Sequence, residues 1–411
     1  MTTNRWFQLV ASLIAMVMIA NLQYAWTLFV NPMREANGWS LPDVQWAFTL
    51  FILFQTWIQP LDGWLIDRMG PRLFISAAGI LCGFGWAGLG YASSLPMLYA
   101  LYCLAGIGAA LVYSGCIGSA LKWFQDRRGF AAGIIAAGFG GGTALFIPII
   151  AYLIANRGYR SAFLWTGAIQ GTMIFVVAQF LRHPSHAAVA AAPVRGGVAS
   201  SSRPQFTTGE MLRTPQFYTM YAAMLLMGIG GLMVTAQAGP MAKSFGLAAS
   251  ALTLAATLSP LANGASRIFW GWSSDRIGRE RAMIIAFVLQ AIALLMVVGV
   301  GRLSAGWFAL SLVFVYFTWG EIYSLFPSMV GDYFGSRHST SNYSVLYTSK
   351  GVASIVGGGF AAVLFERFGS WSAAFYGTAA LALIAAGLAV GLRMAGAPVK
   401  RVEGVPAVTS S

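Results

Sequence analysis

The sequence predicts an all-α membrane protein whose twelve transmembrane helices form two six-helix bundles. Three observations predict this class: the composition, the recurrence of long apolar runs, and an internal repeat. Of the 411 residues, 58% are hydrophobic and only 9% are charged, and the mean hydropathy is +0.70. A soluble domain carries about 25% charged residues. Spans of this length in lipid have to be helices, because each backbone N–H and C=O group must be satisfied within its own segment.

Twelve apolar runs are long enough to cross a bilayer of roughly 30 Å at about 1.5 Å per residue. The first run, Phe7–Val30, is too long for a signal-peptide core and lacks a small-residue cleavage site, so we expect it to remain as the first helix. The twelve predicted spans cover residues 7–30, 43–66, 73–92, 96–121, 129–154, 160–181, 216–237, 249–272, 282–300, 306–330, 342–366 and 371–393.

The basic residues predict the orientation of these spans. With both termini placed in the cytoplasm, 17 of the 25 Lys and Arg residues fall on the cytoplasmic face and six on the opposite face, while two lie inside spans. This bias follows the positive-inside rule. It accounts for the net charge of +13 without a nucleic-acid partner. We therefore expect a multi-pass protein of a bacterial inner membrane with both termini in the cytoplasm.

The spans divide into two halves. Residues 183–210 are rich in Ala, Ser, Pro and Gly without an apolar period, which is typical of a flexible linker. We expect an N-terminal bundle over residues 1–182, a cytoplasmic linker over 183–215, a C-terminal bundle over 216–395 and a cytoplasmic tail over 396–411.

The halves resemble each other at two places. GWLIDRMGPR (63–72) matches GWSSDRIGRER (271–281) at a distance of 208 residues, and WFQDRRG at Trp123 matches YFGSRHS at Tyr333 at a distance of 210. Two equal periods indicate two repeated six-span bundles.

The first repeated loop fits the pattern GxLxDRxGxR, and on this pattern the chain resembles the major facilitator superfamily. The acid–arginine pairs of the two loops are candidates for a charge latch that closes the cytoplasmic side; the alternative is a solvated turn with favourable helix-end electrostatics. The candidate gating residues are Asp67, Arg68, Asp275 and Arg276.

Arg267 and Lys350 are the two cations inside predicted spans. A charge at the bilayer centre costs roughly 2.5–3.5 kcal/mol on insertion scales, and such residues mark ion pathways. The acidic residues within spans are Asp62 and Glu366 near helix ends and Glu321 in mid-span. Two cations and at most one central acid leave positive charge unpaired, which predicts an anionic cargo. A structural ion pair is the alternative.

Polar and aromatic residues accompany these cations at helical spacing. Ser259, Asn263 and Arg267 recur every four residues, and Tyr343, Tyr347, Lys350 and Ser354 recur at four, three and four. Tyrosine hydroxyls can hold carboxylate oxygens without adding net charge. Each aromatic taken alone is also compatible with packing or with an interface belt. The further polar or aromatic candidates within spans are Gln23, Tyr24, Tyr113, Trp319 and Tyr323.

Several segments resemble the oxalate/formate antiporter family: NRWFQLV, QYAWTLFVNP, GEMLRTPQF, NGASRIFWGWSSDRIGR, FTWGEIYSLFPS and KGVASIVGGG. The resemblance implies a secondary active antiporter that exchanges oxalate for formate by alternating access. It places the family's substrate-binding arginine and lysine on Arg267 and Lys350. The family's cavity aromatics and glutamines fall on Gln23, Tyr24, Gln45, Tyr113, Trp319 and Tyr323.

Two positions depart from the family's prototype. Tyr347 stands where the prototype has tryptophan, and Glu321 stands where it has glycine, so the size or the charge of the cavity changes. Glu321 lies two residues from both Trp319 and Tyr323, about 200° around a helix, so it points away from the cavity if those aromatics face it. With Glu321 as a proton carrier, the alternative function is a proton-coupled symporter of monocarboxylates such as lactate or pyruvate.

The sequence argues against other classes of function. His183, His186 and His338 lie in or beside loops without a catalytic or metal-binding pattern, so we expect no enzyme, no metal and no cofactor. The chain has no Gly-Lys dipeptide, which excludes a P-loop and ATP-driven pumping. The expected partners are small carboxylate anions and the lipid bilayer, with no nucleic acid, and we expect a monomer.

Overall fold

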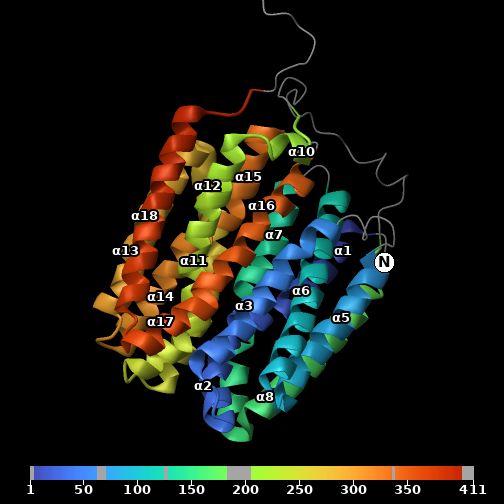
Figure 1. The fold of residues 1–411 in the computed structure, drawn as a ribbon. Coiled ribbons are helices and arrows are strands. Elements are labelled where there is room, and N and C mark those ends of the chain that lie inside the picture. Colours follow the sequence, from blue (N-terminus) through green and yellow to red (C-terminus); the bar gives the residue numbers. More distant parts are fainter. Residues whose placement is uncertain (1–3, 63–70, 125–127, 183–204, 336–337, 400–411) are drawn as a thin grey trace, which may run out of the picture.

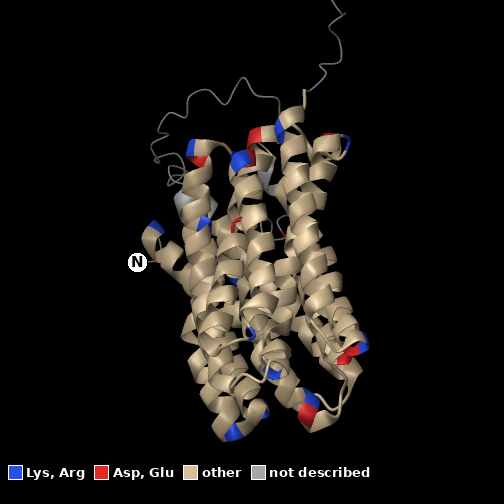
Figure 2. Ribbon diagram, turned by 90° about the vertical axis from the view of Figure 1, so that its left-hand side faces the viewer, with Lys and Arg blue, Asp and Glu red and all other residues tan. Residues whose placement is uncertain are grey.

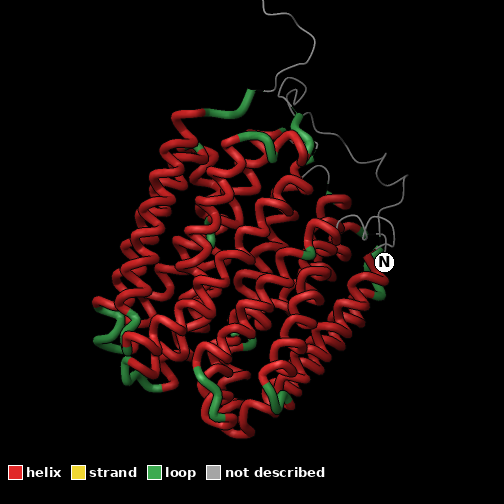
Figure 3. Tube along the Cα trace, in the orientation of Figure 1, coloured by secondary structure: helices red, strands yellow, loops and turns green. Residues whose placement is uncertain are grey.

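The computed structural model of the chain describes residues 4–62, 71–124, 128–182, 205–335 and 338–399 (Figure 1). These residues form helices joined by short loops, and the described part contains no strand (Figure 3). The helices run between two ends of the molecule. Residues 205–215 and α10 (Thr208–Met211) lie at one end, here called the linker end, and α2 (Trp26–Asn37) lies at the other, here called the far end (Figure 1).

The first half of the chain forms one group of helices, coloured blue to green in Figure 1. Its elements are α1 (Arg5–Tyr24), α2, α3 (Leu41–Trp57), α5 (Pro71–Gly88), η1 (Leu89–Tyr91), α6 (Leu95–Trp123), α7 (Arg128–Gly141), η2 (Gly142–Leu145) and α8 (Ile147–Ala178).

The second half forms a group coloured green to red. After α10 come α11 (Pro215–Ser244), α12 (Ala249–Ile277), α13 (Arg279–Gly299), α14 (Ala305–Trp319), α15 (Ile322–Phe334), α16 (Ser339–Ser354), the π-helical η4 (Ile355–Phe360), α17 (Ala361–Phe368) and α18 (Ser372–Ala395).

The twelve-span prediction is confirmed, although several spans are broken. In the described part of the chain, nine helices are long and apolar enough to cross a membrane. One of these, residues 133–178, contains two predicted spans, because the chain turns at Gly158, whose φ of +77° favours glycine. The shorter α3 and the more polar α12 supply the remaining two spans.

Charged side chains gather at the two ends of the molecule (Figure 2). The long middle region is almost free of them, as expected for a surface in contact with lipid tails, where charge is costly. Arg267, Lys350 and Glu321 are exceptions among the described residues, and all three are buried.

The two groups of helices meet chiefly where α3 packs against α16 and η4, where α7 packs against α12, and where α2 packs against α11. Glycines allow this close approach. A Cβ on Gly358 would clash with Thr49 of α3, and a Cβ on Gly140 would crowd Asn263 and Arg267 of α12. Small residues at such contacts let helix backbones come together in a membrane.

The predicted linker ends in defined structure. Residues 183–204 lie outside the described residues, but Thr207 and Glu210 form a capping box that starts α10. The Phe206 amide donates to the carbonyl of Phe334 (2.9 Å), and the Asn342 side chain donates to the Phe206 carbonyl (3.1 Å). The end of the linker is thereby attached to α15 and α16. The tail beyond residue 399 lies outside the described residues.

Candidate functional site

Arg267 lies in the middle of α12 and is 5% exposed. It shares a helix face with Ser259 and Asn263, since residues four apart on a helix are neighbours. Its Nη2 donates to Asn263 Oδ1 (3.0 Å), and its Nη1 donates to the carbonyl oxygen of Ala136 on α7 (2.6 Å). Arg267 therefore joins the two halves of the molecule through neutral acceptors.

Lys350 lies on α16 and is 1% exposed. Its Nζ donates to Gln23 Oε1 on α1 (2.9 Å), to Gln55 Oε1 on α3 (3.0 Å) and to the Tyr347 hydroxyl (3.3 Å). All three acceptors are neutral. No ion pair with Lys350 or Arg267 is present among the described residues, so hydrogen bonds hold these cations in place while their charge stays uncompensated.

Tyrosine rings connect the two cations. Arg267 Cζ lies 4.7 Å from the ring centre of Tyr323, and Lys350 Nζ lies 5.7 Å from the same centre and 5.4 Å from that of Tyr347. The ring of Tyr347 lies 6.0 Å from Tyr323 and 5.9 Å from Tyr113, with which it stacks. Cations over aromatic faces are attracted to the ring quadrupole. We call these five residues, which come from α6, α12, α15 and α16, the cation–tyrosine cluster.

Two further aromatic candidates border the cation–tyrosine cluster. Trp319 packs edge-on against Tyr323 at 5.5 Å, and its ring fills the space above Gly231 of α11. Tyr24 reaches the cluster through Phe139 of α7, whose ring lies 5.5 Å from both Tyr24 and Tyr113. The predicted candidates from five spans therefore meet between the two halves of the molecule.

The cation–tyrosine cluster and Tyr343, whose ring lies 5.6 Å from that of Tyr347, offer hydrogen-bond donors that the described protein groups leave unused. Arg267 Nε and the hydroxyl groups of Tyr323 and Tyr343 are buried without a hydrogen-bond partner in the described part of the chain. Buried donors of this kind are costly unless something accepts from them. Together with two uncompensated cations, they suit a small molecule that carries several anionic oxygens.

Gln45 lies apart from this cluster. Its side-chain amide donates to the Ala236 carbonyl (2.8 Å) and to Gln237 Oε1 (3.0 Å), both on α11, and its Oε1 accepts from Trp26 Nε1 (3.2 Å). Asn263 by contrast contacts Arg267 directly. The structure thus brings together every predicted substrate-binding residue except Gln45, which connects α3 to α11 nearer the far end.

Two further residues of this region, Gln55 and Phe139, were not predicted from the sequence. Gln55 belongs to no helical pattern of polar residues in the sequence. In the structure its Oε1 accepts a hydrogen bond from Lys350 Nζ. Phe139 is an apolar residue in a glycine-rich helix, and its ring lies 5.7 Å from Lys350 Nζ. A polar residue in the middle of the predicted span 43–66 was the only available sign of Gln55, and nothing in the sequence distinguishes Phe139 from a packing residue.

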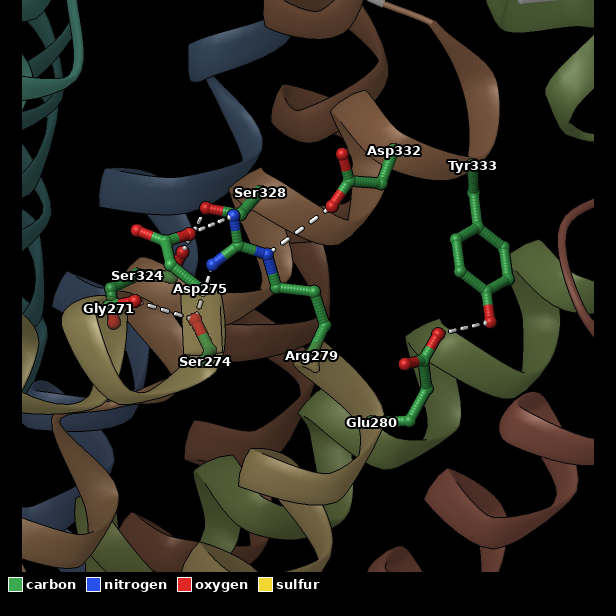
Figure 4. A network of polar contacts seen from close by, with 9 residues as sticks. All are labelled: Gly271, Ser274, Asp275, Arg279, Glu280, Ser324, Ser328, Asp332 and Tyr333. Atoms are coloured by element: carbon green, nitrogen blue, oxygen red, sulfur yellow. Dashed lines mark hydrogen bonds and ion pairs between the residues drawn. The ribbon is translucent and has the colours of Figure 1, made fainter. Parts of the chain in front are cut away.

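The candidate gating residues that the structure describes lie at the linker end. Asp275 forms an ion pair with Arg279 (2.6 Å), which also contacts Asp332 (3.3 Å) (Figure 4). Arg276 stands 3.8 Å from the ring centre of Trp272. These contacts all stay within the second half. Asp67 and Arg68 lie outside the described residues.

An open cavity of about 540 Å³ adjoins these charges, and Tyr333 donates from its hydroxyl to Glu280 Oε1 (2.9 Å) at its wall. Asp275, Arg279 and Asp332 also line it. This cavity lies at the end of α12, two turns or more beyond Arg267, and is separate from the cation–tyrosine cluster.

Glu321 lies between α14 and α15 and is completely buried. Neither of its carboxylate oxygens has a hydrogen-bond partner in the described part of the chain. On this helix it stands about 200° from Trp319 and from Tyr323, and those two rings contact each other at the cluster. The carboxyl group therefore belongs to another face of the helix.

Comparison with known proteins shows which family this chain resembles. The Major Facilitator Superfamily profile matches residues 11–236 and 220–405, so each half matches separately. The chain is 40% identical over 400 residues to the oxalate:formate antiporter of Oxalobacter formigenes, which covers 97% of this chain and 94% of that protein. It is 28% identical over 358 residues to the uncharacterized transporter YhjX of Escherichia coli (86% of each chain).

More distant similarity extends to animal transporters. Human monocarboxylate transporter 11 is 27% identical over 240 residues, which is 58% of this chain and 49% of that protein. The near-complete match to the bacterial antiporter and the two superfamily matches agree with the helical fold and with the positions of the repeated loops. The chain therefore belongs to the oxalate/formate antiporter family of the major facilitator superfamily.

Proposed function

We propose that this chain is a secondary active transporter that exchanges oxalate for formate by alternating access. The observation that carries the proposal is the pair of buried cations, Arg267 and Lys350, which lie between the two halves and contact only neutral acceptors. The relative from Oxalobacter formigenes bears this activity in its name and matches nearly the whole chain.

The cluster gives each carboxylate of oxalate a different partner. The guanidinium of Arg267 offers a planar fork that fits one carboxylate with two hydrogen bonds, while Lys350 acts as a compact point charge for the other. Tyr323 and Tyr113 supply hydroxyl donors and aromatic walls. Gln23 and Asn263 hold the two cations in position. Tyr24, Trp319 and Tyr347 close the sides of the site.

The charge of the site favours exchange over uniport. The two cations border the same tyrosine ring and repel each other, because like charges interact strongly in a site of low effective dielectric constant. Burying them unpaired during closure adds several kcal/mol. A bound dianion cancels both charges, so the loaded carrier closes more easily than the unloaded one. A carrier with this property returns across the membrane only with another anion.

Contacts between the halves indicate which side is closed. Thr49 of α3 donates to the Ser354 carbonyl (2.9 Å) and accepts from the Gly359 amide (3.0 Å), and Asn31 of α2 donates to the Gly239 carbonyl (3.2 Å). These bonds lie on the far-end side of the cluster. We infer a state that is closed at the far end, with the Asp67, Arg68, Asp275 and Arg276 latch acting at the linker end.

The same proposal includes the orientation of the chain in the membrane, the bounds of its two bundles and its oligomeric state. The far end faces outward and the linker end faces the cytoplasm of a bacterial cell, because the basic residues concentrate on the linker side. The bundles span residues 1–182 and 216–395, joined by the linker 183–215 and followed by a tail from 396. The carrier works as a monomer, because one chain supplies both halves of the site.

The test uses purified protein in lipid vesicles loaded with labelled oxalate. We expect rapid release of label into buffer that contains formate or oxalate, and release at least tenfold slower into buffer without a permeant anion. Release at the full rate into anion-free buffer would refute obligatory exchange.

The alternative is a proton-coupled monocarboxylate symporter, which the buried Glu321 and the distant monocarboxylate relatives favour. A competition panel of oxalate, formate, lactate, pyruvate, malonate and succinate distinguishes the two. A symporter takes up lactate or pyruvate into unloaded vesicles when the outside is acidic, whereas the exchanger requires an anion inside.

A further inference from the structure

The ammonium group of Lys350 has no hydrogen-bond donor to spare in this structure. An ammonium group carries three N–H donors and no acceptor. Lys350 Nζ donates to Gln23 Oε1 (2.9 Å), to Gln55 Oε1 (3.0 Å) and to the Tyr347 hydroxyl (3.3 Å). All four side chains belong to residues that are at most 1% exposed. A carboxylate that binds Lys350 directly must therefore displace one of these three acceptors.

The guanidinium group of Arg267, by contrast, can bind an anion without losing a contact. A guanidinium group has five N–H donors. Nη1 donates to the Ala136 carbonyl and Nη2 donates to Asn263 Oδ1. Nε is buried and has no hydrogen-bond partner in the described part of the chain. Because free donors remain at Arg267, a single carboxylate binds there more readily than at Lys350.

The Tyr347 hydroxyl is the weakest of the three acceptors on Lys350. Its distance of 3.3 Å is the longest of the three and exceeds the usual range of N–H···O hydrogen bonds, about 2.7–3.2 Å. Gln23 and Gln55 offer amide carbonyl oxygens, which accept more strongly than a phenol oxygen because the phenol ring withdraws electron density. Displacing Tyr347 therefore costs less than displacing either glutamine.

The surroundings of Tyr347 allow it to be released. Its hydroxyl also interacts with the hydroxyl of Tyr113 on α6, and the two rings stack with their centres 5.9 Å apart. When Lys350 turns to a carboxylate, Tyr347 keeps its contact with Tyr113. The two glutamines lie on α1 and α3 of the other half, so they still hold Lys350 at the contact between the halves.

We propose that the Tyr347 hydroxyl occupies the position that the second carboxylate of the cargo takes on Lys350, and that its displacement makes the site distinguish a dianion from a monoanion. The proposal rests on the oxalate/formate exchange proposed above. Arg267 Cζ and Lys350 Nζ lie 4.7 Å and 5.7 Å from the ring centre of Tyr323, so the two carboxylates of oxalate meet one cation each. Oxalate then releases Tyr347, whereas formate binds at Arg267 and leaves the Lys350–Tyr347 bond in place.

This displacement lowers the affinity for oxalate and leaves the affinity for formate unchanged. Two cations attract a dianion more strongly than a monoanion, so oxalate would otherwise bind far more tightly than formate. A carrier that binds one cargo too tightly releases it slowly. The lost contact between Lys350 and Tyr347 offsets part of the difference and brings the affinities of the two exchange partners closer together.

The experiment measures the binding of both anions to the purified full-length protein. Calorimetric titration gives the dissociation constant of oxalate, and displacement of oxalate gives that of formate. Tyr347→Phe keeps the ring and removes the acceptor, so we expect oxalate to bind about fivefold more tightly, which is the effect of one ordinary hydrogen bond. The dissociation constant of formate should change less than twofold.

Exchange kinetics in lipid vesicles separate displacement from a structural role. Tighter binding slows release, so Tyr347→Phe should lower both KM and kcat of oxalate/oxalate exchange, each by up to about fivefold. A packing defect would lower kcat without tightening oxalate binding. Thermal unfolding checks that the variant is folded.

Two matched variants test which acceptor is displaced. Gln55 acts through Lys350 as a positioning residue, so Gln55→Met should weaken oxalate binding at least fivefold, which is the opposite sign to Tyr347→Phe. Tyr99→Phe removes a hydroxyl that donates to the Asp43 carbonyl near the far end (2.9 Å) and should change the binding of neither anion.

Three results would overturn the proposal. The first is a folded Tyr347→Phe protein that binds oxalate no more tightly than the wild type. The second is an equal gain in formate affinity, and the third is tighter oxalate binding in Gln55→Met, which would identify the glutamine as the displaced acceptor. A wild-type protein that binds no oxalate would instead refute the proposed exchange itself, and that result is distinct from an unchanged preference in Tyr347→Phe.

Discussion

Replacement of Lys350 by glutamine tests the charge of the site. Lys350→Gln keeps a polar side chain of similar reach but removes the positive charge and one of the three donors that contact Gln23, Gln55 and Tyr347. Truncating one partner of a buried, hydrogen-bonded charge pair costs about 2–5 kcal/mol. We therefore expect oxalate to bind about 30- to 5,000-fold more weakly, since about 1.4 kcal/mol corresponds to a factor of ten.

The same substitution at Lys243 is the matched control. Lys243 pairs with Glu35 at the far end, and the two side chains are 59% and 62% exposed. Exposed ion pairs are worth about 0–1 kcal/mol, so Lys243→Gln should weaken oxalate binding less than about fivefold. Calorimetric titration of the purified proteins with oxalate gives both dissociation constants, and thermal unfolding checks that the variants are folded.

The result that would refute this reasoning is specific. A folded Lys350→Gln protein that binds oxalate within threefold of the wild type would show that Lys350 is a structural residue whose hydrogen bonds only join α16 to α1 and α3. The anion site would then have to rest on Arg267 alone.

Two more predictions concern packing and closure. Gly231→Ala places a methyl group on the indole ring of Trp319, so we expect a loss of about 1–3 kcal/mol of stability and a lower melting temperature. The control is Gly377→Ala, which lies in α18 with open space around it and should be neutral or stabilising. Equal melting temperatures of the two variants would contradict the packing argument. Thr49→Val removes two hydrogen bonds between the halves, each worth about 1 kcal/mol. Amide hydrogen exchange in α3 and η4 should then rise roughly 30-fold, whereas Thr253→Val, whose hydroxyl bonds only to its own helix, should leave it unchanged.

Much of this architecture could be predicted because lipid imposes simple rules on sequence. A helix that crosses a bilayer must be apolar over a fixed length, so twelve spans could be recognised from the chain alone. The same rule makes Arg267 and Lys350 conspicuous, since a buried charge needs a reason. The two repeated halves are separated by the linker, so both cations could be assigned to the second half. In the structure both cations lie where the two halves contact each other.

The partners of those cations could not be predicted in the same way. Gln55 meets Lys350 only because α3 crosses α16, and that crossing depends on glycines such as Gly358 that let the backbones approach. Gln45, nearly three turns earlier on α3, has the same side chain but bonds to α11. Which glutamine reaches the cation is decided by the register between two helices from different halves, and a single helix does not encode that register.

Glu321 illustrates how one helix can serve two chemistries. Rotation by about 200° over two residues separates its carboxyl group from the rings of Trp319 and Tyr323, so the anion site and the buried acid occupy different faces of the same segment. The register of two residues alone therefore decides which side chains of this segment line the cation–tyrosine cluster and which are buried on another face.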